Sequence, residues 1–139
     1  MFRKILAGFD GSDHSRRAAK IAGDLARAQT SAEMWLVCVL EPVPAELGQP
    51  YLDKLIAERK FAGDRLIQEA RELIGEGVEI HEELLFGSPA ETILEVAENR
   101  DCDLIIMGTR GLGGLAGLLL GGQIQKVISL ADCPVLAVK

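Results

Sequence analysis

The chain has 139 residues, of which 48% are hydrophobic, and its net charge at pH 7 is -6. This length suits a single domain over residues 1–139, and no apolar run reaches the roughly 18 residues that a membrane-spanning helix needs. The negative charge disfavours nucleic acid as a partner, because nonspecific binding to phosphates depends on Lys and Arg.

The three cysteines, Cys38, Cys102 and Cys133, form no C-x-x-C pair and are odd in number. This pattern argues against a disulfide framework or a zinc site. We expect Cys38 to pack in the core and the other two to lie where strands begin. The first residues do not form a signal-peptide pattern, and a reducing cytoplasm is the expected location.

Residues 3–9 predict a buried strand, and Asp10-Gly11-Ser12 then predicts a turn with Ser12 as the cap of a helix. Apolar residues recur in that helix at i, i+3, i+4 and i+7. The expected buried stripe consists of Ala18, Ile21, Ala22 and Leu25. A second strand is predicted over about 34–40.

Prolines and glycines interrupt regular structure over residues 42–50, and a long helix is predicted from about 52 to 74. Its inward residues are expected to be Leu66, Ala70 and Leu73. The sequence leaves open whether residues 42–52 form a lid over a site or pack beside it.

A third strand over 78–86 precedes Ser88-Pro89-Ala90-Glu91, which fits a capping box with proline at the first helical position. The helix that starts there is expected to bury Ala90, Ile93, Leu94 and Ala97.

Residues 103–107 form a short apolar run typical of a strand that helices cover on both faces. A glycine-rich stretch over 108–122 follows, then a predicted helix over 123–131 and a last strand over 134–138. Five strands that alternate with four helices predict an α/β fold, a single doubly wound, mainly parallel sheet with helices on both faces.

Ligands of such sheets bind beyond the carboxyl ends of strands, where the order of connection reverses. The turn at Asp10 follows the first predicted strand, and the glycine-rich stretch follows the fourth. Gly121-Gly122-Gln123 opens the last helix, where free N–H groups and the helix dipole favour a phosphate. The alternative is that these glycines only form a mobile connection.

Signals for other chemistry are weak. Residues 111–116 satisfy G-x-G-x-x-[GA], but they do not follow the first strand, and the acidic partner of a dinucleotide site is missing. A nucleophile elbow is absent too, so no catalytic residue is predicted and the chain is expected to be at most a very slow ATPase. His14 and His81 are expected on the surface, without neighbouring metal ligands.

Taken in order, these segments resemble the universal stress protein family. Gly108-Thr109-Arg110-Gly111, nine further residues and Gly121 match that family's G-x-x-G, nine residues, G-[ST] motif in spacing. Residues 5–12, 87–90 and 133–138 resemble its opening strand and D-G-S turn, its G-x-P-A helix start and its C-P-V-L-x-V closing strand. The resemblance covers essentially the whole chain and implies a Rossmann-like, adenine nucleotide alpha hydrolase-like fold with strand order 3-2-1-4-5.

The resemblance also implies an adenine-nucleotide site; the family includes members that bind ATP, here with Mg²⁺, members that bind other adenine nucleotides and members that bind none. Asp10 and Val39 would border the adenine and ribose, and Gly8 would let the nucleotide approach the first strand. The path of the phosphates would be lined by Met107, Gly108, Thr109, Arg110 and Gly111, and the terminal phosphates would be held by Gly121, Gly122 and Gln123. Two alternatives without a ligand stay open. Asp10 could be an ordinary turn residue, and Arg110 could point to solvent.

The chain departs from the motif where a hydroxyl is expected. Gly122 occupies the [ST] position, and the apolar Ile124 follows two residues later. Two functions therefore remain. One is an ATP-binding module of the stress response with little or no catalysis; the other is a dimeric interaction protein that binds no nucleotide. The resemblance also implies a homodimer that pairs through residues 134–138.

Overall fold

The computed structural model describes residues 1–110 and 122–139, which form a parallel sheet with helices on both faces. The strands are β1 (Lys4–Gly8), β2 (Glu33–Leu40), β3 (Glu79–Phe86), β4 (Leu104–Gly108) and β5 (Val135–Val138). They pair in parallel in the order β3-β2-β1-β4-β5. The predicted α/β class, the parallel pairing and the strand order are thus confirmed.

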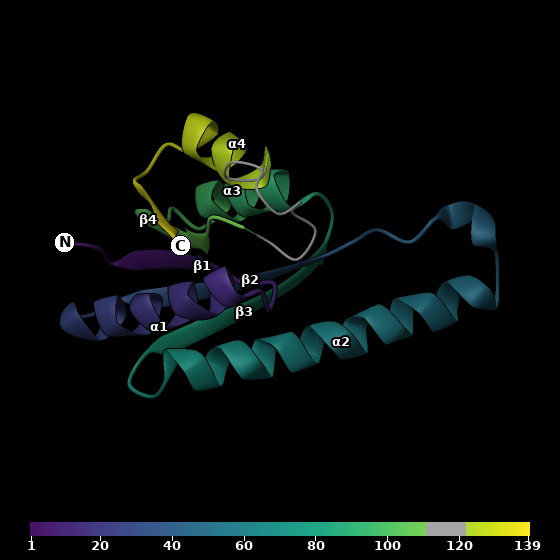
Figure 1. The fold of residues 1–139 in the computed structure, drawn as a ribbon, viewed down its shortest axis with the longest axis horizontal. Helices are drawn as coiled ribbons and strands as arrows, with labels where there is room; N and C mark the ends of the chain where they lie inside the picture. The colour runs from purple at the N-terminus through teal and green to yellow at the C-terminus, as the bar shows by residue number, and fades with distance from the viewer. Residues whose placement is uncertain (111–121) are drawn as a thin grey trace.

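Two helices cover each face of this sheet (Figure 1). On one face lie α1 (Asp13–Ala28) and α2 (Tyr51–Ile74), and on the other lie α3 (Pro89–Asn99) and α4 (Gly122–Leu130). Successive side chains of a strand point to opposite faces. Ile5 and Ala7 therefore join the core under α1 and α2, whereas Leu6 joins the core under α3 and α4.

Helix α1 packs closely because its buried face consists of small residues. Ser12 caps it as predicted, since its Oγ accepts the N–H of Ser15 at 3.3 Å. The expected stripe is wrong at Ile21, whose side chain is 40% exposed. A Cβ added at Gly23 would lie 2.2 Å from the carbonyl oxygen of Ile74 on α2. The two backbones approach so closely that only small side chains fit between them.

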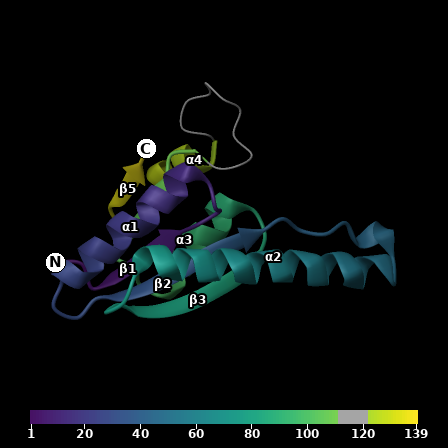
Figure 2. The ribbon, with the colours of Figure 1, turned by 60° about the horizontal axis from the view of Figure 1, so that its bottom comes forward.

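Helix α2 extends beyond the rest of the molecule. Its buried residues are Gly63, Ile67, Ala70 and Ile74, all in its C-terminal half. Leu66 and Leu73, predicted to face inward, are partly buried against the same core. None of residues 41–62 is buried, and this segment, which includes a short helix η1 (Ala45–Leu47), projects away from the sheet (Figure 2). We call residues 42–62 the arm.

Helix α3 begins at the predicted residues but with a different cap. Ser88 is the N-cap and Pro89 the first helical residue, yet the Ser88 side chain makes no capping hydrogen bond. The N–H of Ala90 instead donates to Oε1 of Gln123 on α4, at 2.9 Å. Glu91, the expected return partner of the capping box, pairs with Lys126 of α4. Contacts with the neighbouring helix therefore add to the local interactions at this helix start.

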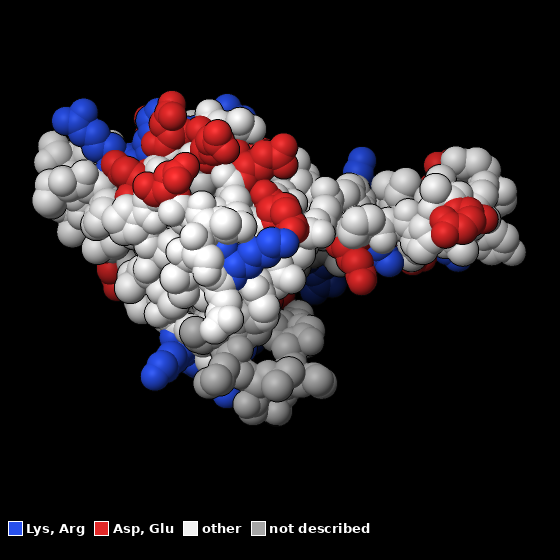
Figure 3. All heavy atoms as spheres, turned by 90° about the horizontal axis from the view of Figure 1, so that it is seen from above, with Lys and Arg blue, Asp and Glu red and all other residues white. Residues whose placement is uncertain are grey.

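The surface reflects the composition of the chain. Acidic side chains gather on the body of the molecule in the face shown in Figure 3, in line with the net charge of -6. Across residues 1–110 and 122–139, no helix has both the length and the hydropathy that crossing a bilayer demands.

Candidate functional site

A pocket of about 400 Å³ opens at the carboxyl ends of β1 and β4. These two strands are neighbours in the sheet although they are far apart in the chain, so the order of connection reverses between them. Open α/β sheets bind ligands at such a point. The described residues that line the pocket are Gly8, Phe9, Asp10, Ser15, Val37, Val39, Pro89, Ile93, Met107, Gly108, Thr109, Arg110, Gly122, Gln123 and Ile124.

The structure brings together the described part of the predicted site. Gly111 and Gly121 lie outside the described residues, and the other predicted residues all line the pocket: Gly8, Asp10, Val39, Met107, Gly108, Thr109, Arg110, Gly122 and Gln123. No pocket-lining residue in the described part comes from 42–52, so this segment does not cover the opening in this structure.

Sequence reasoning missed several pocket residues. Phe9, Ser15, Val37, Pro89 and Ile93 also line the cavity. Val37 precedes Val39 by two positions on β2, and period-two alternation places both on the same face of the sheet. Ser15 lies three residues after the cap of α1. Strand alternation and helix capping were thus the available signals for Val37 and Ser15.

Side-chain hydrogen bonds tie the start of α1 to the segment after β4. The Oγ of Ser12 donates to the carbonyl oxygen of Arg110 at 3.0 Å. His14 Nδ1 and Thr109 Oγ1 share a hydrogen bond of 2.8 Å. His14 is partly exposed, and its ring also contacts Thr109, one of the residues that line the pocket, a role that the expectation of a surface residue did not include.

Asp10 helps to build the turn that borders the pocket. Its Oδ1 accepts the N–H of Ser12 at 2.9 Å, and its own N–H donates to Oγ of Ser15 at 3.4 Å. Gly11 between them has φ +82°, a left-handed conformation that glycine adopts without steric cost. The turn role considered for Asp10 is present, and the same residue also lines the cavity.

Gly108 allows the first turn of α1 to lie directly against β4. A Cβ at this position would be 2.8 Å from the carbonyl carbon of His14 and 2.8 Å from the backbone nitrogen of Ser15. Any other residue would push α1 away from the sheet and open the floor of the pocket. Part of the glycine pattern therefore serves packing rather than ligand contact.

Gly122, unlike Gly108, has space around it for a side chain. It is exposed, it is the first residue of α4, and a Cβ added to it would meet nothing within 4 Å. Ile124, two residues later, is 2% exposed and belongs to the core under α3 and α4. The apolar side chain of residue 124 therefore packs in the interior. At residue 122, by contrast, a side chain with a hydroxyl would have room at the entrance of the pocket.

The pocket offers one basic and one acidic side chain among its described lining residues, Arg110 and Asp10. The dipole of α4 adds a partial positive charge where Gly122 opens that helix. Lys126, one turn further on, is held by Glu91, and this hydrogen bond lowers the pKa of Glu91. The charges present suit the binding of an anion better than acid–base catalysis.

The cysteines lie where the sequence placed them. Cys38 is 1% exposed in the core. Cys102 and Cys133 lie just before β4 and β5, at the ends of the strands away from the pocket. Burial raises the pKa of Cys38 and of Cys102 to about 12. Neither thiol is therefore a ready nucleophile at neutral pH.

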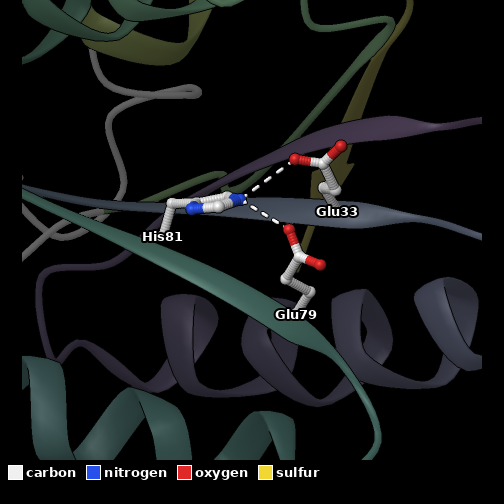
Figure 4. A group of neighbouring side chains, drawn as sticks. All are labelled: Glu33, Glu79 and His81. Carbon is white, nitrogen blue, oxygen red and sulfur yellow. Dashed lines mark hydrogen bonds and ion pairs between the residues drawn. The ribbon is translucent and has the colours of Figure 1, made fainter.

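His81 differs from its expected surroundings. Its Nε2 lies 3.0 Å from a carboxylate oxygen of Glu33 and 3.0 Å from one of Glu79 (Figure 4). The expectation that no potential ligand neighbours this histidine is thus wrong. The pairing of β2 with β3, which linear spacing does not show, brings Glu33 to it.

Comparisons with known proteins agree with this architecture. The model of the universal stress protein family matches residues 1–139. A universal stress protein of Thermus aquaticus, from the 3' region of a QAH/OAS sulfhydrylase gene, is 45% identical over 100% of both chains. The solved structure of MJ0577 of Methanocaldococcus jannaschii has a TM-score of 0.86 and 28% identity, and covers 100% of this chain and 96% of that one.

A third relative was solved with a ligand. The crystal structure of a universal stress protein in complex with cAMP has a TM-score of 0.73 and 26% identity, and the match covers 99% of this chain and 97% of the other. The fold, the matched family model and the full-length relatives lead to one conclusion. The chain belongs to the universal stress protein family.

Proposed function

We propose that this chain is an adenine-nucleotide-binding module of the stress response that binds ATP with Mg²⁺ and catalyses little or no hydrolysis. The observation that carries the proposal is the pocket at the carboxyl ends of β1 and β4, which is lined by every described residue of the predicted site. The relative solved with cAMP supports the adenine part of the proposal.

The two ends of the pocket suit the two ends of a nucleotide. Val37, Val39 and Ile93 supply apolar surface for a flat base on the side of β2 and α3. Arg110 and the start of α4 supply the positive character that phosphates need. Mg²⁺ would accompany the phosphates, and the bound cation would offset their charge near Asp10.

A non-catalytic role follows from what lines the cavity. Asp10 is the only carboxylate among the described lining residues, and its Oδ1 already accepts the N–H of Ser12. A general base must reach the water that it activates, and a carboxylate fixed within a turn is poorly placed to do so. We therefore expect ATP binding without rapid turnover.

The test is titration calorimetry of the nucleotide-stripped chain with ATP and Mg²⁺, with GTP as the comparison ligand. Arg110→Gln should weaken ATP binding by about ten- to hundredfold, the range expected for one charge-assisted hydrogen bond. Arg100→Gln is the matched control, because Arg100 pairs with Glu83 away from the pocket. Equal affinity for ATP and GTP, or no heat with either, contradicts the proposal.

A second candidate function is favoured by the gap at Gly122 and by the edge strand. Here the chain binds no nucleotide and acts as a homodimer that presents a surface to other proteins. Among the described strands β5 pairs only with β4, and Leu136 on it is 38% exposed. Exposed apolar residues on an edge strand favour pairing with a second copy. Absence of ATP binding, together with a dimer in solution, supports this alternative.

A further inference from the structure

A cluster of three potential metal ligands lies where β2 and β3 begin, at the opposite end of the strands from the pocket. Glu33 opens β2, Glu79 opens β3, and His81 follows two residues later. One ligand atom from each, Nε2 of His81 and a carboxylate oxygen of each glutamate, lies within 4.8 Å of the other two. Figure 4 shows both carboxylates turned toward the same ring nitrogen.

The register of the sheet creates this cluster. Glu33 is the direct partner of Glu79, and Trp35 is the direct partner of His81. Side chains two residues apart on a strand share a face, so all four lie on the same side of the sheet. The Trp35 and His81 rings stack with centroids 4.7 Å apart and an interplanar angle of 28°. This contact holds the imidazole with Nε2 toward the carboxylates.

The two glutamates of the cluster lie opposite each other, and in the described part of the chain His81 is the only basic side chain that pairs with either of them. Two glutamates directly opposite each other on paired strands repel. Glu83, on the same face of β3, pairs with Arg100 at 2.8 Å, but within the described residues neither Glu33 nor Glu79 forms an ion pair with Lys or Arg. Lys4 holds its Nζ over the Trp35 ring, 5.9 Å from the centroid.

A proton on Nε2 has to be shared between two carboxylates in this arrangement. His81 carries at most one hydrogen on Nε2, while two carboxylate oxygens lie 3.0 Å from that nitrogen. A cation with several coordination positions would bind all three atoms at once. Tetrahedral bonds of about 2.1 Å to Zn²⁺ place donor atoms about 3.4 Å apart, so each N···O distance of 3.0 Å needs to lengthen by about 0.4 Å. The two carboxylate oxygens already lie within 4.8 Å of each other.

We propose that Glu33, Glu79 and His81 form a binding site for a divalent transition-metal cation, of which Zn²⁺ is the preferred one. One imidazole nitrogen and two carboxylate oxygens suit zinc, whereas magnesium favours oxygen ligands in octahedral geometry. The side chains are 38% (Glu33), 64% (Glu79) and 41% (His81) exposed, so a cation reaches them from solvent and water completes its coordination. The site would fasten β3, an edge strand, to β2.

The experiment is titration calorimetry of the reduced, metal-stripped chain with ZnCl₂ alone, without nucleotide, and with MgCl₂ as the comparison. We expect one Zn²⁺ per chain and no detectable Mg²⁺. Single variants Glu33→Gln, Glu79→Gln and His81→Gln should each weaken zinc binding by at least about tenfold, because even partners outside the coordination shell affect affinity by about 10- to 100-fold. Glu83→Gln removes the same charge from the same face and should leave zinc binding unchanged.

Tryptophan fluorescence provides a local readout that separates this site from the thiols. Trp35 is the only tryptophan of the chain and lies against His81. Co²⁺, whose open d shell quenches a nearby indole, should quench Trp35 emission in the native chain and in Glu83→Gln but not in His81→Gln. Unchanged zinc affinity in all three ligand variants, or no binding up to millimolar ZnCl₂, overturns the proposal and leaves the cluster as a histidine bridge between two strands.

Discussion

At the residue scale, the proposed phosphate site predicts that a change at Gly122 alters ATP affinity. The backbone N–H groups at the start of α4 remain, but the side-chain hydroxyl that the family motif supplies is missing. We expect Gly122→Ser to raise ATP affinity by about ten- to hundredfold, the value of one added hydrogen bond to a charged group. Calorimetry on the native and variant chains measures the difference directly.

Gly122→Ala is the matched control. It adds the same Cβ without the hydroxyl, and that Cβ meets nothing within 4 Å. Both variants should unfold at a similar or slightly higher temperature, because glycine costs a helix up to about 1 kcal/mol relative to alanine. Only serine should change the affinity. An equal gain with alanine would mean that helix stability, not the hydroxyl, limits binding.

The buried thiol of Cys38 should make the stability of the fold decrease at alkaline pH. Its pKa is about 12 in the folded chain because the thiol is buried, against an ordinary value of 9.0. A raised folded-state pKa contributes stability that is complete below pH 9 and is lost as the pH rises toward 12. One thiol accounts for at most about 1.4 kcal/mol per pH unit of this slope.

Denaturant unfolding across this pH range tests the assignment. Cys38→Ala should unfold with a shallower loss of stability above pH 9, although the variant starts from a lower value because it leaves a small cavity. Val37→Ala truncates a neighbouring buried residue of β2 without removing a titrating group, and it should keep the native slope. Identical slopes in all three chains would show that folding does not raise the pKa of Cys38.

At the element scale, the contact between α1 and α2 depends on Gly23. The missing side chain lets the backbone of α1 reach the carbonyl oxygen of Ile74, where a Cβ would lie 2.2 Å away. Gly23→Ala should therefore lower the free energy of unfolding by about 1–3 kcal/mol, as overpacking does. The same substitution at Gly122, also in a helix, should not destabilise the chain.

The elements themselves could be predicted because each has a local signal. Hydrophobic periodicity and the positions of Pro and Gly predicted the strands and helices to within a few residues. The resemblance to the family predicted the strand order. The inward face of α1 was wrong at Ile21 because the pattern favours large apolar residues, whereas the distance between α1 and α2 admits only small ones. Such a distance is a property of the packed pair and does not appear in either helix alone.

The same distinction applies to the candidate site. The predicted residues on β1, β4 and α4 could be named because the motif is local and its segments follow strands. The contact between His14 and Thr109 and the cap that Gln123 supplies to α3 join residues far apart in the chain. The cluster at His81 depends on strand register, which composition and spacing do not encode.

At the scale of the whole molecule, the exposed edge of the sheet predicts self-association. Leu136 on β5 and Ile128 and Leu130 on α4 are 38%, 47% and 60% exposed, respectively. We expect a dimer by light scattering at micromolar concentration, and Leu136→Lys should give a monomer because charge on an edge strand opposes pairing. Phe61→Lys, on the arm, should leave the mass unchanged. A native chain that scatters as a monomer contradicts the dimer.

The arm has a consequence for how the molecule moves through solution. Residues 51–62 of α2 precede the first buried residue of that helix, Gly63, and at about 1.5 Å per residue they add about 18 Å to one dimension. Friction grows with the longest dimension of a particle, so a chain of 15.0 kDa with this outline diffuses more slowly than a sphere of equal mass. On a gel-filtration column calibrated with compact proteins, a lone copy would elute early and pass for an assembly.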